Sequence, residues 1–159
     1  MKLFEITQEN NLYHHTKDPA AFLNTLTTNI IPDSWYARYQ EWHPTGHYAV
    51  SSKEHWPFPA RGKQDFVQMQ LTISPEASVW NITDRKLFDE FWKFYISNYP
   101  NASQSYDDFI VNLPITEIQA INKEWTNLVK SKYDIVHITD GDDEHIILNN
   151  NIIQDVQQA

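Results

Sequence analysis

Histidines and carboxylates that could support chemistry occur in two separate parts of the chain. Five histidines fall in the first third, at His14, His15, His43, His47 and His55. Three consecutive acids, Asp142, Asp143 and Glu144, come late in the chain, directly before the run HIIL. Histidine binds metals and moves protons near neutral pH, and a carboxylate acts as a base or stabilises developing positive charge. These residues are therefore the first candidates for a functional site.

The spacing of the early histidines argues against a metal site. His43 and His47 are four residues apart, which would place them on one face of a helix, but the segment HPTGH contains proline and glycine and is not helical. His14 and His15 lie in a short predicted strand, where adjacent side chains point to opposite faces. One ring is expected to face the core and the other solvent. We therefore predict no metal site, keep a His-ligated metalloenzyme as an alternative, and interpret His43 and His55 as loop histidines.

Other common catalytic motifs are absent from the sequence. The chain has no cysteine, and it therefore offers no thiolate nucleophile, no disulfide and no Cys-type zinc site. It contains no G-x-S-x-G segment, and its three glycines do not form a phosphate-binding loop. The acids at 142–144 either act electrostatically or as a base in a tight turn, or form a solvated acidic turn.

The hydrophobic pattern predicts the strands that would position these groups. The clearest is FVQMQLTI at 66–73, where apolar and polar side chains alternate with the period of a half-buried strand. Further strands are predicted at 12–14, 47–51, 78–82, 133–139, 145–148 and 152–156. Irregular stretches are expected at 33–46, which is rich in aromatic residues, and at 53–62.

Three helices are predicted between these strands. Asp18 followed by Pro19 is typical of a helix start, which predicts a helix over 19–29. Asp84 is expected to cap a second helix with an aromatic face, and a third is predicted over 116–130. The order of strand, helix, strands, helices and strands favours an α+β domain with mostly antiparallel strands over a doubly wound sheet.

The size and charge of the chain narrow the classes of function. Its 159 residues suit a single domain, which we place over 1–159. The net charge of −9 argues against general nucleic-acid binding but permits a basic protein surface as partner. No apolar run approaches the roughly 20 residues of a membrane span, and MKLFEITQENN lacks the apolar run of a signal peptide. We therefore expect no membrane partner.

Three segments become more informative when they are taken in order. A strand ends in Tyr-His-His-Thr before a capped helix, a second strand reads Gly-His-Tyr-Ala-Val-Ser at 46–51, and an acidic turn precedes Glu-His-Ile-Ile-Leu. In these segments the chain resembles the ADP-ribosyltransferase superfamily in its His–Tyr–Glu form. There the first strand often reads Tyr-His-Gly-Thr, the second carries a tyrosine shortly after a glycine, and the third begins with a glutamate. Small bacterial and phage members, including an anti-CRISPR transferase with an Asp-Glu-His segment near its end, are similar in length and C-terminal layout.

The resemblance implies a fold and a reaction. The fold would be an ADP-ribosyltransferase-like arrangement of split antiparallel β-sheets with flanking helices. The co-substrate would be NAD, whose nicotinamide–ribose bond breaks through an oxocarbenium-like transition state that a nearby carboxylate stabilises. Glu144 would be that carboxylate. Asp143 is the alternative, because sequence does not fix the register of three acids in a turn.

The resemblance also implies a set of NAD-binding residues. His14 would bond a ribose of NAD, as the family histidine does, and Thr16 would support this edge. Tyr48 would stack on the nicotinamide ring, with a core tyrosine as the alternative, and Ser51 at the end of the same segment would belong to the NAD-binding set. His15 stands where the family has glycine, and its backbone would clasp the carboxamide while its imidazole points away.

The function implied is ADP-ribosylation of a macromolecule, with a protein target expected rather than a nucleic acid. Such a protein would be a bacterial or phage effector, toxin or counter-defence factor in the cytoplasm of its producer or of a target cell. A variant within this class only hydrolyses NAD. The alternative class is a non-catalytic protein-interaction module that binds a partner through its aromatic loop and acidic surface.

Overall fold

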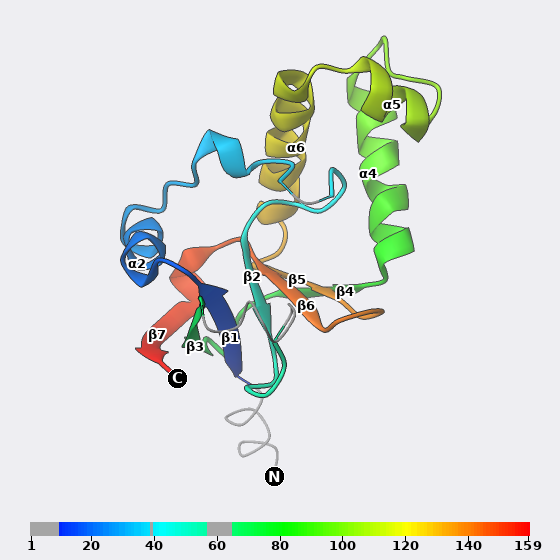
Figure 1. Ribbon diagram of the computed structural model, residues 1–159. Helices are drawn as coiled ribbons and strands as arrows, with labels where there is room; N and C mark the ends of the chain where they lie inside the picture. The colour runs from blue at the N-terminus through cyan, green and yellow to red at the C-terminus, as the bar shows by residue number, and fades with distance from the viewer. Residues whose placement is uncertain (1–9, 39, 57–64) are drawn as a thin grey trace.

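A computed structural model describes residues 10–38, 40–56 and 65–159, and within these ranges the strands form one sheet (Figure 1). The strands are β1 (Asn11–Thr16), β2 (His47–Val50), β3 (Val67–Ile73), β4 (Val79–Ile82), β5 (Ile135–Ile138), β6 (Glu144–Ile147) and β7 (Ile153–Gln158). Their order across the sheet is β4-β5-β6-β2-β1-β3-β7. Strands β4 and β5 pair in parallel and the other neighbours pair antiparallel, which makes the sheet mixed.

The helices of the described ranges are α2 (Pro19–Thr28), α4 (Asp84–Asn98), α5 (Tyr106–Asn112) and α6 (Ile115–Lys130). Short 3₁₀ turns occur at Asp33–Trp35 and Asn150–Ile152. Figure 1 shows α4, α5 and α6 gathered on one side of the molecule, with α2 apart from them. Among the helices so described, none combines the length and the apolar character that crossing a bilayer requires.

The helix starts show which local predictions are correct. Asp18 caps α2 as predicted, because its side chain accepts a hydrogen bond of 3.0 Å from the backbone N–H of Ala21. In helix α4 the N-cap is Thr83, whose side chain accepts a hydrogen bond from the backbone N–H of Lys86. The prediction that Asp84 is the cap is therefore wrong by one residue. Asp84 is the first helical residue, and its carboxylate bonds other partners described below.

The two faces of the sheet carry separate cores. On the face covered by α4 and α6, Val136 and Ile146 pack in one apolar cluster with Trp125. On the opposite face, Met69 packs in a second cluster with Phe22 of α2. We call these the α6 face and the α2 face. Alternation along each strand decides which face a side chain reaches.

The strand register assigns the candidate residues to these faces. One row of cross-strand partners runs across β1, β2, β6, β5 and β4. Its members, in that order, are His14, Ala49, His145, His137 and Asn81. They share the α2 face, because Ala49 belongs to the core on that side. Tyr48 pairs with Ile146 and packs against the core of the α6 face.

The predicted α+β class and the predominance of antiparallel pairs are confirmed. The split-sheet arrangement of an ADP-ribosyltransferase is not confirmed: β2 pairs with both β1 and β6, and the strands of the described ranges belong to one sheet. The sequence pattern does not predict α5, and it makes β5 longer than the observed strand. Of the irregular stretch predicted over 53–62, residues 57–62 lie outside the described ranges, as do the first nine residues of the chain.

Candidate active site

A polar cluster on the α6 face brings together residues from four segments of the chain. Glu144 opens β6, Tyr48 lies in the neighbouring β2, Asp84 begins α4, and His43 lies in the loop before β2. His43 is the centre of the cluster. Its Nε2 is 2.7 Å from Oδ1 of Asp84, and its Nδ1 is 3.4 Å from the Tyr48 hydroxyl and 3.9 Å from Oε2 of Glu144. Two of the residues predicted from sequence, Tyr48 and Glu144, are thus joined through a third that was interpreted as an ordinary loop histidine.

Helix α6 fixes the loop that carries His43. Asn122, which is 1% exposed, donates from Nδ2 to the carbonyls of Glu41 and His43 at 2.9 and 2.8 Å. Its Oδ1 accepts from Ala37 N–H and from the Thr45 hydroxyl. All the hydrogen-bonding capacity of one buried amide is therefore used to hold the loop against the helix.

The hydrogen bonds of His43 restrict its tautomer. Carboxylate oxygens of ionised Asp84 only accept, so His43 Nε2 carries the hydrogen of the 2.7 Å contact. In the neutral ring, Nδ1 then accepts from the Tyr48 hydroxyl. Glu144 Oε2 lies 3.9 Å from the same Nδ1, which makes it the nearby carboxylate for a protonated ring. Trp42 adds a second donor to Asp84, through Nε1 at 2.9 Å.

The electrostatic environment of Glu144 favours a carboxyl that takes up a proton more readily than usual. Partial burial raises the pKa of Glu144; His43 opposes this rise, and the charges of Asp84 and Asp142 add to it. The side chain is 39% exposed and is therefore accessible to a ligand. A carboxylate of this kind can act as a base or stabilise a developing cation.

His14 lies on the other face of the sheet, away from this cluster. Its ring stacks on Phe22 with centroids 4.2 Å apart and lies 5.6 Å from the ring of His47. Its Nδ1 donates to the backbone carbonyl of Tyr48 at 2.7 Å. Burial lowers the pKa of His14, and the bond to Tyr48 offsets only part of this effect. The side chains of His14 and Glu144 thus lie on opposite faces of the sheet, and His14 bonds the backbone carbonyl of Tyr48.

His15 and Thr16 occupy different environments. The alternation predicted for the two histidines is confirmed, since His15 leaves the α2 face, packs on Trp56 at 4.4 Å and lies 3.1 Å from the Gln68 amide. Thr16 ends β1, where its hydroxyl accepts from the backbone N–H of Asp18 at 3.1 Å. Thr16 therefore shapes the turn into α2.

Asp143 and Ser51 form a second polar cluster. The Asp143 backbone has φ of 57°, a left-handed conformation that aspartate tolerates in turns. Its Oδ2 accepts from both the backbone N–H and the hydroxyl of Ser51, while its Oδ1 faces His137 and His145. Burial alone would raise the pKa of Asp143. The bonds from Ser51 and the two nearby imidazoles outweigh burial, and the net pKa is lowered.

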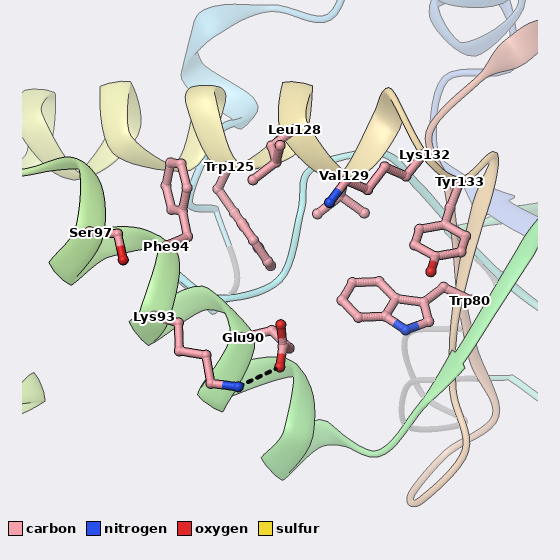
Figure 2. Close-up of a pocket in the computed structure, with 10 residues that line it drawn as sticks. All are labelled: Trp80, Glu90, Lys93, Phe94, Ser97, Trp125, Leu128, Val129, Lys132 and Tyr133. Carbon is pink, nitrogen blue, oxygen red and sulfur yellow. Dashed lines mark hydrogen bonds and ion pairs between the residues drawn. The ribbon is translucent and has the colours of Figure 1, made fainter.

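A cavity of about 330 Å³ lies apart from both clusters, between α4, α6 and β4 (Figure 2). Its lining residues are Trp80, Glu90, Lys93, Phe94, Ser97, Trp125, Leu128, Val129, Lys132 and Tyr133. The rings of Trp80 and Tyr133 are stacked at 5.0 Å, and Lys93 pairs with Glu90 at 3.0 Å. None of the residues predicted from sequence to bind NAD lines this cavity. We base the candidate site on the polar cluster, because it contains the groups with suitable chemistry.

Comparison with known proteins gave no relatives: no family model matches the chain, and neither a curated protein nor a solved structure matches it significantly.

Proposed function

We propose that this protein is an ADP-ribosyltransferase similar to the His–Tyr–Glu form, but with its strand histidine in a positioning role, and that it uses NAD to modify a protein target. The observation that carries the proposal is the adjacency of three strands that are far apart in sequence. Strands β6, β2 and β1, which hold the three resembling segments, are consecutive neighbours in the sheet. In addition, Tyr48 and Glu144 lie on one face with His43 between them. This arrangement offers an aromatic ring and a carboxylate to the same ligand.

In this proposal Glu144 is the catalytic residue. The C1′–N bond of NAD breaks, and its electron pair leaves with nicotinamide. Positive charge then develops on the ribose and is stabilised by the Glu144 carboxylate. A nucleophile of the target attacks C1′ and loses its proton to Glu144 or to water. The products are nicotinamide, the ADP-ribosylated target and one proton.

The remaining residues bind or position. Tyr48 stacks its ring on the nicotinamide, an aromatic face against a flat heterocycle. His43, held by Asp84, orients both the Tyr48 hydroxyl and the Glu144 carboxylate. His14 is a positioning residue, because its ring lies on the α2 face and bonds the backbone carbonyl of Tyr48. This differs from the direct ribose contact that the family resemblance implies.

The acidic surface supports a basic protein as the target. The chain carries 21 acidic and 12 basic residues, and such a charge attracts a basic surface while repelling nucleic acid. A role as a bacterial or phage effector, toxin or counter-defence factor follows from the resemblance. The absence of cysteine suits action in a reducing cytoplasm, of the producer or of a target cell.

The proposal is tested by incubating the protein with NAD labelled on its adenylate phosphate and with bacterial lysates. We expect label on protein and release of nicotinamide, both reduced about 100- to 1000-fold in Glu144→Gln, as for loss of one preorganised electrostatic group. Glu76→Gln is the matched control, because Glu76 is an exposed acid in the turn after β3. Nicotinamide release without labelled protein identifies the variant that only hydrolyses NAD. No label, no nicotinamide and no NAD-dependent thermal shift would reject the proposal in favour of an interaction module.

A further inference from the structure

Two histidines that are distant from the early group face each other across strands β5 and β6. His137 and His145 are direct cross-strand partners, and their rings are stacked with centroids 4.0 Å apart and planes 9° apart. Asp143, from the turn before β6, directs Oδ1 at both rings, 3.5 Å from His137 Nε2 and 3.7 Å from His145 Nδ1. One ligand atom from each of the three residues lies within 4.8 Å of the others.

Neighbouring residues leave Nε2 of His137 and Oδ1 of Asp143 facing the trio, while His145 Nδ1 also lies 3.3 Å from the backbone carbonyl of Asp143, a contact that a bound ion would replace. The Asn81 side-chain oxygen is 2.9 Å from His137 Nδ1 and accepts its hydrogen, so the lone pair of the neutral ring is on Nε2. Ser51 occupies Oδ2 of Asp143 with two hydrogen bonds, which leaves Oδ1 facing the rings. Partners of this kind, which fix the tautomer and orientation of ligands, are typical of metal sites.

The side-chain separations within the trio are compatible with a bound metal ion. The two carboxylate–imidazole separations of 3.5 and 3.7 Å exceed the usual range for a hydrogen bond. They are close to the roughly 3.4 Å edge of a tetrahedron whose corners lie 2.0–2.1 Å from a zinc ion. In the polar cluster around His43, by contrast, the shortest carboxylate–imidazole contact is the 2.7 Å hydrogen bond between His43 and Asp84.

We propose that His137, Asp143 and His145 bind one divalent transition-metal ion of the zinc type. Two imidazoles and one carboxylate are ligands for zinc and its neighbours, whereas calcium and magnesium require oxygen ligands. The side chains are 27%, 35% and 13% exposed, so an ion can enter and a water can fill the fourth position. Because the rings are nearly parallel, one imidazole rotates out of the stack when the ion binds.

The bound ion would clamp the turn between β5 and β6. Its ligands come from both strands and from the turn, within nine residues of sequence. This inference does not rest on the proposed NAD chemistry, since the trio lies on the α2 side of the sheet and Glu144 on the other. A metal that binds only the folded chain raises its stability in proportion to the logarithm of its concentration.

The experiment uses the full chain, made without a histidine tag and stripped of metal by a chelator. Zinc is titrated in competition with a chromophoric chelator, and cobalt is titrated while its visible absorption is recorded. We expect one ion per chain and an absorption typical of four-coordinate cobalt. His137→Gln, Asp143→Asn and His145→Gln should each weaken binding about 100-fold or more, and Asn81→Ala about 10-fold. His55→Gln, which removes a histidine outside the trio, should bind as tightly as the native chain.

Circular dichroism and metal-free thermal unfolding establish that each variant is folded. In the native chain, ¹⁵N spectra of the imidazoles should show zinc-dependent shifts at His137 Nε2 and His145 Nδ1. Absence of stoichiometric binding would overturn the proposal. So would binding that the trio variants leave unchanged, or that His55→Gln weakens equally. Ring shifts confined to the other histidines of the chain would also contradict it.

Discussion

Asp143 and Glu144 are adjacent in sequence but belong to two different clusters. Glu144 faces a network on the α6 face in which the buried Asn122 and the 2.7 Å His43–Asp84 bond hold each partner in place. Asp143 faces two imidazoles at distances too long for strong hydrogen bonds, and it is held from outside by Ser51. The first cluster is therefore bonded internally between His43 and Asp84, whereas in the second the closest bonds to Asp143 come from Ser51 and its separations from the two imidazoles are longer. One turn supplies a carboxylate to each cluster.

The backbone of the turn explains how two neighbours come to face opposite directions. Gly141 has φ of 114° and Asp143 has φ of 57°, both in the region that L side chains rarely adopt. Strand β6 begins immediately afterwards, at Glu144. Asp143 therefore remains in the turn, while Glu144 enters the alternation of the strand.

The largest expected effect of a single change comes from the internally bonded cluster. Asn122→Ala leaves two buried carbonyls and two buried donors without partners, and it should lower the free energy of unfolding by about 3–5 kcal/mol. NAD turnover should fall with it, because the His43 loop loses its anchor. Urea denaturation measures the first effect. Asn127→Ala, on the exposed side of the same helix, is the control and should change stability by less than about 0.5 kcal/mol. Equal effects of the two changes would show that α6 does not hold the loop.

A buried histidine on the α2 face, His47, makes stability depend on pH. Burial lowers the pKa of His47 to about 3, with a further contribution from His14. In the unfolded chain the ring has a pKa near 6.5. Between about pH 6.5 and pH 3 the ring is therefore protonated in the unfolded state but neutral in the folded state. Stability should therefore fall as the pH decreases from about 6.5 to about 3, by on the order of 4 kcal/mol from this residue.

Denaturation of native protein and His47→Gln at several pH values measures this contribution. Glutamine retains a hydrogen-bonding group near Thr25 but does not titrate. The variant should be less stable at pH 7, and its stability should depend less on pH between 6.5 and 3. Parallel curves for the two proteins would mean that His47 does not stay neutral in the folded state.

A smaller effect is expected for His14→Ala. The change removes a ring stacked on Phe22 and the bond to the Tyr48 carbonyl, and it should cost about 1–3 kcal/mol of stability. Because His14 acts on the site through the Tyr48 backbone, kcat/KM for NAD should fall much less than in Glu144→Gln. A loss as large as that of Glu144→Gln would show that His14 touches NAD directly, as the family resemblance implies.

The smallest effect tests the second cluster. Ser51→Ala removes one of the two hydrogen bonds that orient Asp143, so zinc affinity should fall about 10-fold and metal-free stability by about 1 kcal/mol. Competition titration and thermal unfolding measure the two quantities. Ser52→Ala, whose hydroxyl bonds only Glu54 among the described contacts, is the matched control and should leave zinc affinity unchanged. An affinity that is the same in both variants would show that Ser51 does not support a metal ligand.

Local signals in the sequence predict part of this architecture correctly. The Asp18-Pro19 pair predicts the start of α2, and alternation predicts β3 and the divergence of His14 from His15. These predictions are correct because helix caps and strand alternation depend on residues that are close in sequence. The start of α5 carries a similar signal, since Ser105 caps it ahead of two first-turn acids, although no helix is predicted there.

The clusters themselves depend on information that is not local. His137 meets His145 only through the register of β5 and β6, which alternation alone does not specify. His43 is interpreted as a loop residue because its partners, Asp84 and Glu144, are distant in sequence. One signal was available: Asn122 sits among the apolar positions of α6, where a polar residue indicates a buried bonding role.

The central claim is that NAD binds on the α6 face, beside Tyr48 and Glu144. The most direct measurement is a ¹H–¹⁵N NMR titration of the slow variant Glu144→Gln with NAD. We expect shifts of the backbone signals at 48 and 144 and of the Trp42 indole N–H that bonds Asp84, while the signals of Phe22 and Thr25 on the α2 face stay unchanged. Shifts centred on Phe22 and Thr25, or no shift at millimolar NAD, would contradict it.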